Sequence, residues 1–397
     1  MNKKIALIAF PLFFILAATR SIENIKWISY SAPLFYLFFI FDGLKDLKNK
    51  ELRLSLLLIT TFGLWAMVTS CWSTYPRESY IRSLVFMVSS SSLILGGYCW
   101  VKYFREKEFG FLIPLNILLL LVSLFSLMTK IPFDYWAGYG YGLKSFWGHQ
   151  NILASLIIFS LPGIFMLPVK DKKINILITS FLLILNIYIL ILTHSRTSLA
   201  VIILSAFLFA LLSKRIKIFA IIMLIFLTLI ITYMVNNNFQ SHIKNYLFKT
   251  EISLLDRKMP VISASYEAAV IGGWKGLGFG VSDNTVLSNL LFNVHYHFEG
   301  VRLVREKAVS IYALIEETGW IGLILFLFFV LYLLYLTVKT YLNTMSWSSV
   351  MMVCLLIGMS LHAQLEGWWL GVGSVQFPIF MALAGITIGK IGIKAEQ

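Results

Sequence analysis

Arg196 is the residue whose chemistry is hardest to reconcile with its surroundings. It lies in the segment THSRTS, between the apolar runs INILITSFLLILNIYILILT and TSLAVIILSAFLFALLS. An ionisable side chain at membrane depth costs roughly 2.5–3.5 kcal/mol on insertion scales and is by default a candidate for function. The alternative is an arginine at a helix end whose guanidinium reaches back to the membrane interface, and the segment alone favours neither.

Acidic residues also lie at the ends of apolar segments. Glu366 ends an apolar helical pattern in the sequence LHAQLEGWW, and Glu316 and Glu317 precede a wholly apolar run. A carboxylate in such surroundings needs a partner or a change in protonation. Glu316 and Glu317 could instead complement a helix dipole or a neighbouring cation, and this alternative stays open.

The stretch 236–308 combines basic residues, histidines and a glycine-rich turn. Its basic residues suggest an anionic ligand; they are Lys244, Lys249, Arg257, Lys258, Lys275, Arg302, Arg305 and Lys307. The turn GLGFG at 276–280 is similar to a phosphate-cradling turn, but no strand-then-helix pattern surrounds it, so the signal is weak. His295 and His297 could share one side of an extended segment, yet a metal site would need a third ligand.

The composition defines the elements that must position these residues. The 397 residues are 59% hydrophobic and 13% charged, with a mean hydropathy of +0.82. Apolar runs long enough to span a bilayer recur along the chain. They cover residues 5–19, 27–43, 54–70, 82–101, 109–128, 151–169, 174–193, 197–213, 218–235, 309–337, 347–366 and 372–389. We therefore predict an all-α membrane protein with about 12 transmembrane helices, and residues 236–308 as a large loop between helices 9 and 10.

The chain reads as a single domain over residues 1–397, embedded in a lipid bilayer, because it has no repeat and no low-complexity linker. Its first apolar segment could be a signal peptide, but the rest of the chain is equally apolar, so we treat it as the first helix. The cysteines have no spacing typical of a disulfide framework or a zinc site.

The basic residues of the short loops fall mostly on alternate connections. This bias predicts that both termini are cytoplasmic and that the loop 236–308 faces outward. The formal net charge of +14 is largely explained by the same bias, so we expect no nucleic-acid partner.

Two turns adjoin the predicted outer ends of helices. Trp72 and Pro76 are typical of an aromatic residue at the interface followed by a helix stop. Asn151 is placed to cap the helix that begins there, and His149 is expected to be a satisfied interface residue.

Five segments, taken in order, carry a resemblance to a known family. They are Trp72-Ser73-x-x-Pro76, Gly148-x-x-Asn151-x-x-Ala154, Ser195-Arg196-Thr197-Ser198, Arg257 upstream of Gly276-Leu277-Gly278-Phe279-Gly280, and Glu317-Thr318-Gly319-Trp320-Ile321-Gly322. None is specific alone. Their order, in a polytopic protein with a large loop before the tenth helix, resembles the O-antigen ligase and polysaccharide polymerase superfamily over residues 60–385.

The resemblance implies a glycosyltransferase on the outer face of the bacterial cytoplasmic membrane. Such an enzyme moves a glycan from an undecaprenyl-diphosphate carrier to a hydroxyl of lipid A core (a ligase) or of another repeat unit (a polymerase), without a metal or other cofactor. Arg196 and Arg257 match the two functional arginines of the family, and Arg305 is a candidate third. Fixed cations of this kind would stabilise the departing diphosphate.

The chain departs from the ligase pattern at one place. The family's histidine and the polar residue after it correspond to Ala308 and Val309, while Arg305-Glu306-Lys307 resembles a run found in exopolysaccharide polymerases. This favours the polymerase branch. Glu306 or Glu366 is then the candidate general base, unless the diphosphate leaves readily enough to need none. The alternative function is a transporter or flippase of lipid-linked sugars, in which Arg196 would line a path.

Overall fold

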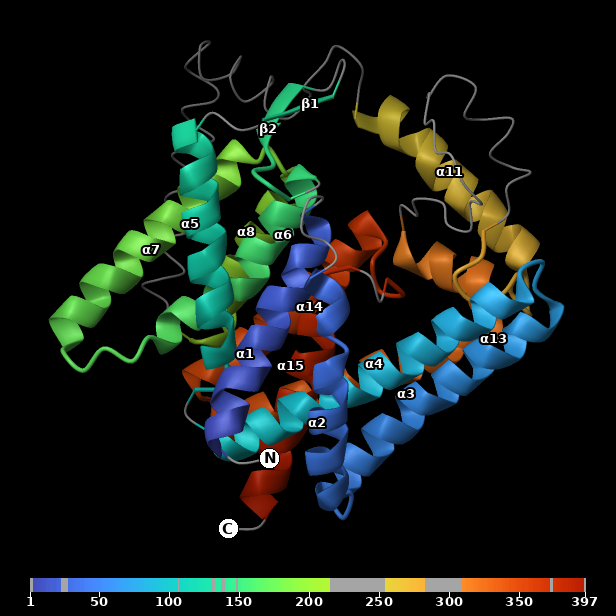
Figure 1. The fold of residues 1–397 in the computed structure, drawn as a ribbon, viewed down its shortest axis with the longest axis horizontal. Helices are drawn as coiled ribbons and strands as arrows, with labels where there is room; N and C mark the ends of the chain where they lie inside the picture. Colours follow the sequence, from blue (N-terminus) through green and yellow to red (C-terminus); the bar gives the residue numbers. More distant parts are fainter. Residues whose placement is uncertain are drawn as a thin grey trace.

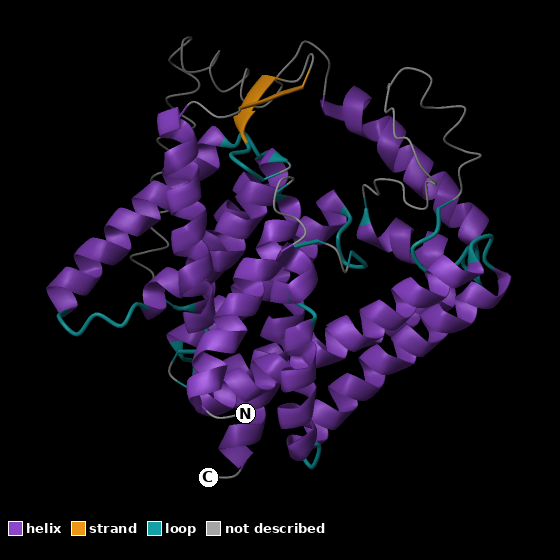
Figure 2. Cartoon of the chain, in the orientation of Figure 1, coloured by secondary structure: helices purple, strands orange, loops and turns teal. Residues whose placement is uncertain are grey.

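The computed structural model is a bundle of helices with one small hairpin (Figures 1 and 2). It describes residues 3–22, 28–105, 107–129, 133–136, 140–147, 149–214, 254–282, 309–371 and 374–395. The helices are α1 (Lys3–Ala18), α2 (Leu34–Gly43), α3 (Lys50–Thr69), α4 (Pro76–Tyr103), α5 (Ile113–Thr129), α6 (Gln150–Ser160), α7 (Lys172–Leu192), α8 (Arg196–Leu212), α11 (Leu254–Gly272), α13 (Ser310–Thr344), α14 (Trp347–Glu366) and α15 (Gln376–Ala395). The strands β1 (Phe133–Trp136) and β2 (Gly140–Leu143) pair antiparallel.

Six of the described helices are long and apolar enough to cross a membrane, by length and composition: α3, α4, α5, α7, α13 and α14. Three shorter apolar helices, of 10–17 residues, begin at Gln150, Arg196 and Gln376. The protein is therefore a helical membrane protein, as its composition predicts. Every predicted span overlaps a described helix except 218–235, which lies outside the described residues.

The centre of the bundle is the pair α4 and α15, which run in the same direction: Phe86 lies beside Phe377 near their starts, and Val101 lies beside Gly389 near their ends. A side chain at Gly97 would overlap the carbonyl of Ala382, and one at Gly385 would overlap the carbonyl of Ile94. Two backbones can approach this closely only because small residues line the contact, which is the usual way helices associate in lipid. The pair thereby fixes where α15 begins, close to the start of α6.

A buried polar cluster joins α5, α6 and α7. Asn116 donates to Ser160 Oγ at 2.9 Å and to Asn186 Oδ1 at 3.0 Å, and Asn186 donates back to Asn116 Oδ1 at 3.2 Å. Within lipid such hydrogen bonds have few competitors, although each contributes only about 0.6 kcal/mol on average. The cluster sets the register of α7, and with it the position of the turn that precedes α8.

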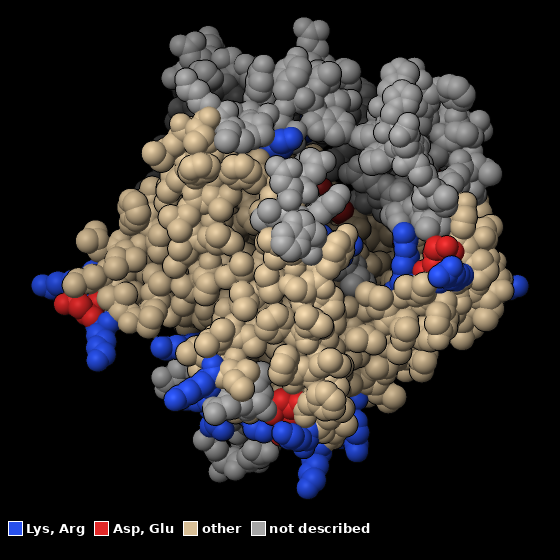
Figure 3. Space-filling view, in the orientation of Figure 1, with Lys and Arg blue, Asp and Glu red and all other residues tan. Residues whose placement is uncertain are grey.

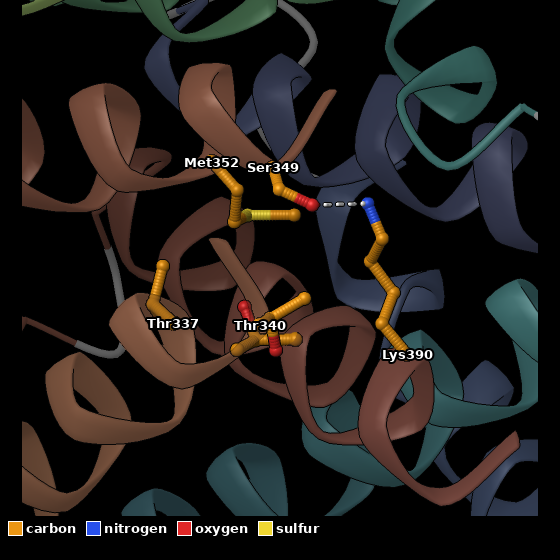
Figure 4. Close-up of a pocket in the computed structure, with 6 residues that line it drawn as sticks. Thr337, Thr340, Ser349, Met352 and Lys390 are labelled. Carbon is orange, nitrogen blue, oxygen red and sulfur yellow. Dashed lines mark hydrogen bonds between the residues drawn. The ribbon is translucent and has the colours of Figure 1, made fainter. Parts of the chain in front are cut away.

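Both termini lie at one end of the bundle (Figure 1), and Lys and Arg side chains gather around that end (Figure 3). There Lys390 Nζ contacts Glu108 Oε1 at 2.6 Å, with the side chain of Glu108 only 3% exposed. Lys390 also donates to Ser348 Oγ at 2.9 Å and Ser349 Oγ at 3.5 Å, the latter across a narrow crevice (Figure 4). The start of α14 therefore lies at the same end as the termini, and Glu366 lies at the opposite end.

Replacing Lys390 with methionine is expected to destabilise this end of the bundle by about 3–5 kcal/mol, because it leaves the Glu108 carboxylate buried and unpaired. The measurement is the thermal midpoint of the purified protein in detergent. Lys102→Met is the matched control, since the Lys102–Asp46 pair has side chains 45% and 20% exposed and such surface pairs contribute about 0–1 kcal/mol. Equal losses in the two variants would contradict the assignment of a buried structural ion pair.

Candidate functional site

Three helix ends meet at the carboxylate of Glu366. Asn151, in the first turn of α6, donates from Nδ2 to both carboxylate oxygens at 3.2 Å. Thr197, in the first turn of α8, donates from Oγ1 to Oε1 at 2.9 Å. Glu366 is the last residue of α14 and is partly buried. Two predicted motif segments, far apart in the chain, thus converge on one predicted acidic residue.

The electrostatics of this arrangement are mixed. Glu366 lies at the C-terminal end of its own helix, where the macrodipole disfavours an anion. The N-terminal turns of α6 and α8, which carry partial positive charge, lie beside the carboxylate and offset this effect. Gly367, with φ of 62°, ends α14 in the left-handed conformation typical of helix C-termini. The carboxylate of Glu366 is therefore stabilised by the N-termini of neighbouring helices, and not by its own helix.

The start of α6 differs from the prediction in one detail. Asn151 does not cap the helix, because His149 is the N-cap residue and its Nδ1 accepts a hydrogen bond from the Asn151 amide at 3.1 Å. An imidazole nitrogen in this role replaces the side-chain oxygen of the usual cap. The Asn151 side chain is thereby available for Glu366. Capping by His149 also agrees with its predicted role as a satisfied residue.

Arg196 is the first residue of α8 and is partly buried. A cation in the first turn of a helix is opposed by the macrodipole, so Arg196 does not stabilise the helix that it begins. The preceding turn contains His194 in the left-handed region with φ of 53°, an uncommon conformation for a residue other than glycine. Arg196 thus lies at a helix end, and its neighbour Thr197 contacts the candidate site.

Ser195 adds a second polar group to this turn. It occupies the N-cap position of α8, yet its hydroxyl makes no capping hydrogen bond. The side chain is 1% exposed, and Oγ has no hydrogen-bond partner within the described part of the chain. A buried hydroxyl without a hydrogen-bond partner is energetically costly and needs an explanation. A bound ligand would supply the missing partner in this turn of polar residues.

His362 supports the site from one helical turn below, although no motif in the sequence pointed to it. Its Nδ1 accepts a hydrogen bond from Trp368 Nε1 at 3.0 Å, and its Nε2 lies 3.3 Å from Ser198 Oγ. Because an indole nitrogen only donates, the imidazole proton must be on Nε2, which donates to Ser198. The spacing of four residues between His362 and Glu366, which places both on one helix face, was the available signal.

The contact between α8 and α14 is close because of Gly358. A side chain at this position would come within 2.7 Å of Ser205 Oγ and 3.2 Å of Val201 Cγ1. At the C-terminal end of α14, Ser310 donates from Oγ to the carbonyl of Ala363 at 2.8 Å and accepts from the Trp369 amide at 3.2 Å. The first residue of α13 is therefore attached beside Glu366.

The glycine-rich turn does not form a phosphate cradle. Its amides already donate within the protein: Gly276 to Gly272, Leu277 to Glu316, Gly278 to Glu317, Phe279 to Thr69 and Gly280 to the Glu317 carboxylate. The turn packs against a break in α13 at Gly319, where φ is 70°. A side chain at Gly276 would overlap the Glu317 carbonyl, and one at Gly319 would overlap the Trp274 carbonyl. The glycines therefore serve close backbone packing.

Glu316 and Glu317 are both buried, at 0% and 4% exposure. Glu317 Oε2 accepts from the Gly280 amide at 2.6 Å, and Arg82 binds the Gly280 carbonyl. Glu317 thus holds the turn, with an arginine at the adjoining peptide, and is not a helix-dipole partner at a first turn.

Tryptophans complete this second cluster. Trp72 donates from Nε1 to the Gly276 carbonyl at 3.0 Å, and Trp65 donates to the Thr318 carbonyl at 2.7 Å. Trp72 therefore has a specific partner in addition to its expected place at the interface. The expected helix stop at Pro76 is corrected. The preceding helix ends at Thr69 with a turn to Trp72, and Pro76 is the first residue of α4, where its missing N–H costs nothing.

The other predicted site residues are placed only in part. Arg257 lies in α11, which packs against α13, and its side chain is outside the described residues. Arg305, Glu306 and Ala308 lie outside the described residues altogether, as do His295 and His297. Within the described ranges, no three His, Cys, Asp or Glu side chains are grouped closely enough to hold a metal ion.

With Arg257 apart, the motif segments therefore gather into two clusters linked by α13. Ser310 adjoins the cluster around Glu366, and Glu317 adjoins the cluster around the glycine turn. Seven residues of helix separate the two, or about 10 Å. No protein-family model matches the chain, and no curated protein matches its sequence. The conclusion on function therefore depends on the geometry of these clusters and on the motif resemblance.

Proposed function

We propose that the protein is a membrane glycosyltransferase that moves a glycan from an undecaprenyl-diphosphate carrier to an acceptor hydroxyl, building bacterial surface polysaccharide. The observation that carries the proposal is the convergence of Asn151 and Thr197 on Glu366, beside Arg196. A cation and a carboxylate fixed at one end of a membrane bundle are the groups that such a transfer needs. The motif resemblance supplies the substrate class.

The chemistry is a displacement at the anomeric carbon of the donor sugar. The bond between that carbon and the diphosphate oxygen breaks, and the diphosphate leaves with the electron pair. Arg196 stabilises the charge that develops on the leaving oxygens, since its planar fork binds phosphate oxygens bidentately and stays charged when desolvated. The acceptor oxygen forms the new glycosidic bond and gives its proton to Glu366, or to Glu306 if that residue is the base.

The polymerase branch is favoured over the ligase branch, because Ala308 and Val309 stand where ligases of the superfamily carry a histidine and the polar residue after it. The orientation that we propose places both termini in the cytoplasm. The concentration of basic side chains at the end of the bundle that carries the termini supports it (Figure 3). Glu366 then faces the periplasm or exterior, where lipid-linked repeat units are presented.

The test is an incubation of the purified protein in detergent with an undecaprenyl-diphosphate-linked repeat unit, with neither divalent metal nor another acceptor present. Products are resolved by size. A ladder of lengthening lipid-linked chains is the expected result and identifies a polymerase. Product only after lipid A core is added would identify a ligase. No product in either case, with movement of the lipid-linked sugar across proteoliposomes, would replace the proposal with transport.

A further inference from the structure

A groove separate from the Glu366 cluster opens between α1, α2, α4 and the start of α15. Its cavity volume is about 330 Å³, at the lower end of the range of ligand sites. The walls are mainly apolar and include Phe13, Ala32, Val85 and Val88. One cation, Arg20, lies among the lining residues. An apolar groove with a single cation has the chemistry of a site for an anionic lipid.

Arg20 is placed to receive an anion. It follows α1 and is exposed, and no ion pair among the described residues includes it. Arg20 and Tyr36 both line the groove. Serine hydroxyls, of Ser29 and Ser374, line the same groove. Guanidinium and hydroxyl donors together are typical of phosphate recognition.

The groove reaches into the depth of the bundle. Phe13 precedes Arg20 by seven residues, so apolar walls continue for about 10 Å below the cation. Neighbouring residues of α2 and α4, such as Leu37 and Val88, are 57% and 37% exposed on a helical membrane protein, so they face acyl chains. Water is a poor occupant of such a groove, whereas a hydrocarbon chain is a good one.

The groove and the Glu366 cluster share structural elements. Two residues after Arg20, Ile22 pairs with Trp147, in the loop that leads to His149 and Asn151. On the other wall, Ser374 precedes Gln376, which donates to Ser155 Oγ at 2.7 Å, one turn along α6 from Asn151. A phosphate at Arg20 would thus lie next to the segments that position the candidate active site.

We infer that this groove binds a second polyprenyl-diphosphate chain, the carrier of the acceptor glycan, with its diphosphate at Arg20. The inference rests on the proposed function, because a polymerase that extends lipid-linked chains must hold two lipid-linked glycans at once. The Arg196 turn serves the donor diphosphate, and the Arg20 groove keeps the acceptor carrier apart from it. The bond chemistry stays at the Glu366 cluster, and Arg20 positions a substrate without taking part in the reaction.

The test is site-specific photo-crosslinking with undecaprenyl phosphate as the probe. Val88 is replaced by a photoreactive phenylalanine analogue in the purified full-length protein, and crosslinked lipid is quantified by mass spectrometry. Adding Arg20→Gln is expected to reduce crosslinking at least tenfold at subsaturating lipid, since a charge-assisted contact is lost. Arg77→Gln is the matched control, because Arg77 is exposed at the start of α4 and lies outside the groove; its crosslinking should stay at the parent level.

Two results would overturn the inference. One is unchanged crosslinking with Arg20→Gln. The other is competition by phosphatidylglycerol at equal concentration, which would make the groove a site for ordinary anionic lipids. Because crosslinking needs no turnover, these outcomes are separate from the incubation that tests glycan transfer. A protein that makes no product with either acceptor but crosslinks in an Arg20-dependent way would refute the proposed function and leave the lipid site standing.

Discussion

Replacing Arg196 with alanine is expected to reduce glycan transfer by at least about 100- to 1,000-fold, the typical effect of removing one group that stabilises charge in a transition state. The fold should persist, because Arg196 begins α8 without capping it. Removal of a cation from a helix N-terminus is, if anything, slightly favourable to that helix. The measurements are the rate of ladder formation and the thermal midpoint of the same preparation in detergent.

Arg196→Lys separates charge from geometry. Lysine keeps the positive charge but loses the planar fork, so an intermediate rate is expected if the guanidinium binds the diphosphate bidentately. Arg257→Ala should behave like Arg196→Ala, as the motif resemblance implies. Wild-type turnover by both alanine variants would remove the proposed role of these arginines. Turnover by Arg196→Lys equal to that of Arg196→Ala would show that the fork matters more than the charge.

The helices could be predicted from the sequence because long apolar runs have few other structures available in a membrane. The predicted positions of the helix ends were less accurate. The span predicted to begin at residue 82 starts at Pro76, six residues earlier, because its first turns are polar and hydropathy does not report them. Residues 254–272, within the predicted outer loop, form α11, which packs on α13.

Individual residues of the candidate site could be predicted from the sequence, but the contacts between them could not. Arg196 and Glu366 are unusual charges at the ends of apolar runs, and a local pattern reveals them. The pairing of Glu366 with Asn151 and Thr197 joins residues 215 and 169 positions apart, and no local pattern encodes it. His362 was missed for the same reason, since its partner Ser198 belongs to a different helix.

The glycine turn illustrates a different limit. A glycine-rich motif indicates that the backbone takes positive φ or approaches something closely, and both hold at Gly276 and Gly319. The sequence does not say what approaches. Here α13 approaches the turn beside its break at Gly319. Carbonyls of α13 accept hydrogen bonds from turn amides that could otherwise donate to a phosphate. Glycine motifs thus predict local conformation more safely than they predict a ligand.

Glu366→Gln is expected to lower the transfer rate by about 100- to 10,000-fold if Glu366 takes the acceptor proton, which is the usual contribution of a general base. The substitution is nearly isosteric. The glutamine carbonyl can still accept from Thr197 Oγ1 and Asn151 Nδ2, so the three helix ends should stay together. The comparison therefore removes the charge while keeping the geometry. Initial rates at saturating lipid-linked substrate are the measurement.

Glu366→Ala supplies the contrast, because it removes the hydrogen bonds as well as the charge. A base should lose nearly the same activity in both variants, whereas a positioning residue should tolerate glutamine and fail only with alanine. Glu267→Gln, an exposed carboxylate on α11, is the control and should retain the parent rate. Near-normal transfer by Glu366→Gln would assign Glu366 to positioning and leave Glu306 as the candidate base. Glu306→Gln should then slow the reaction, and a normal rate there too would mean that diphosphate departure needs no base.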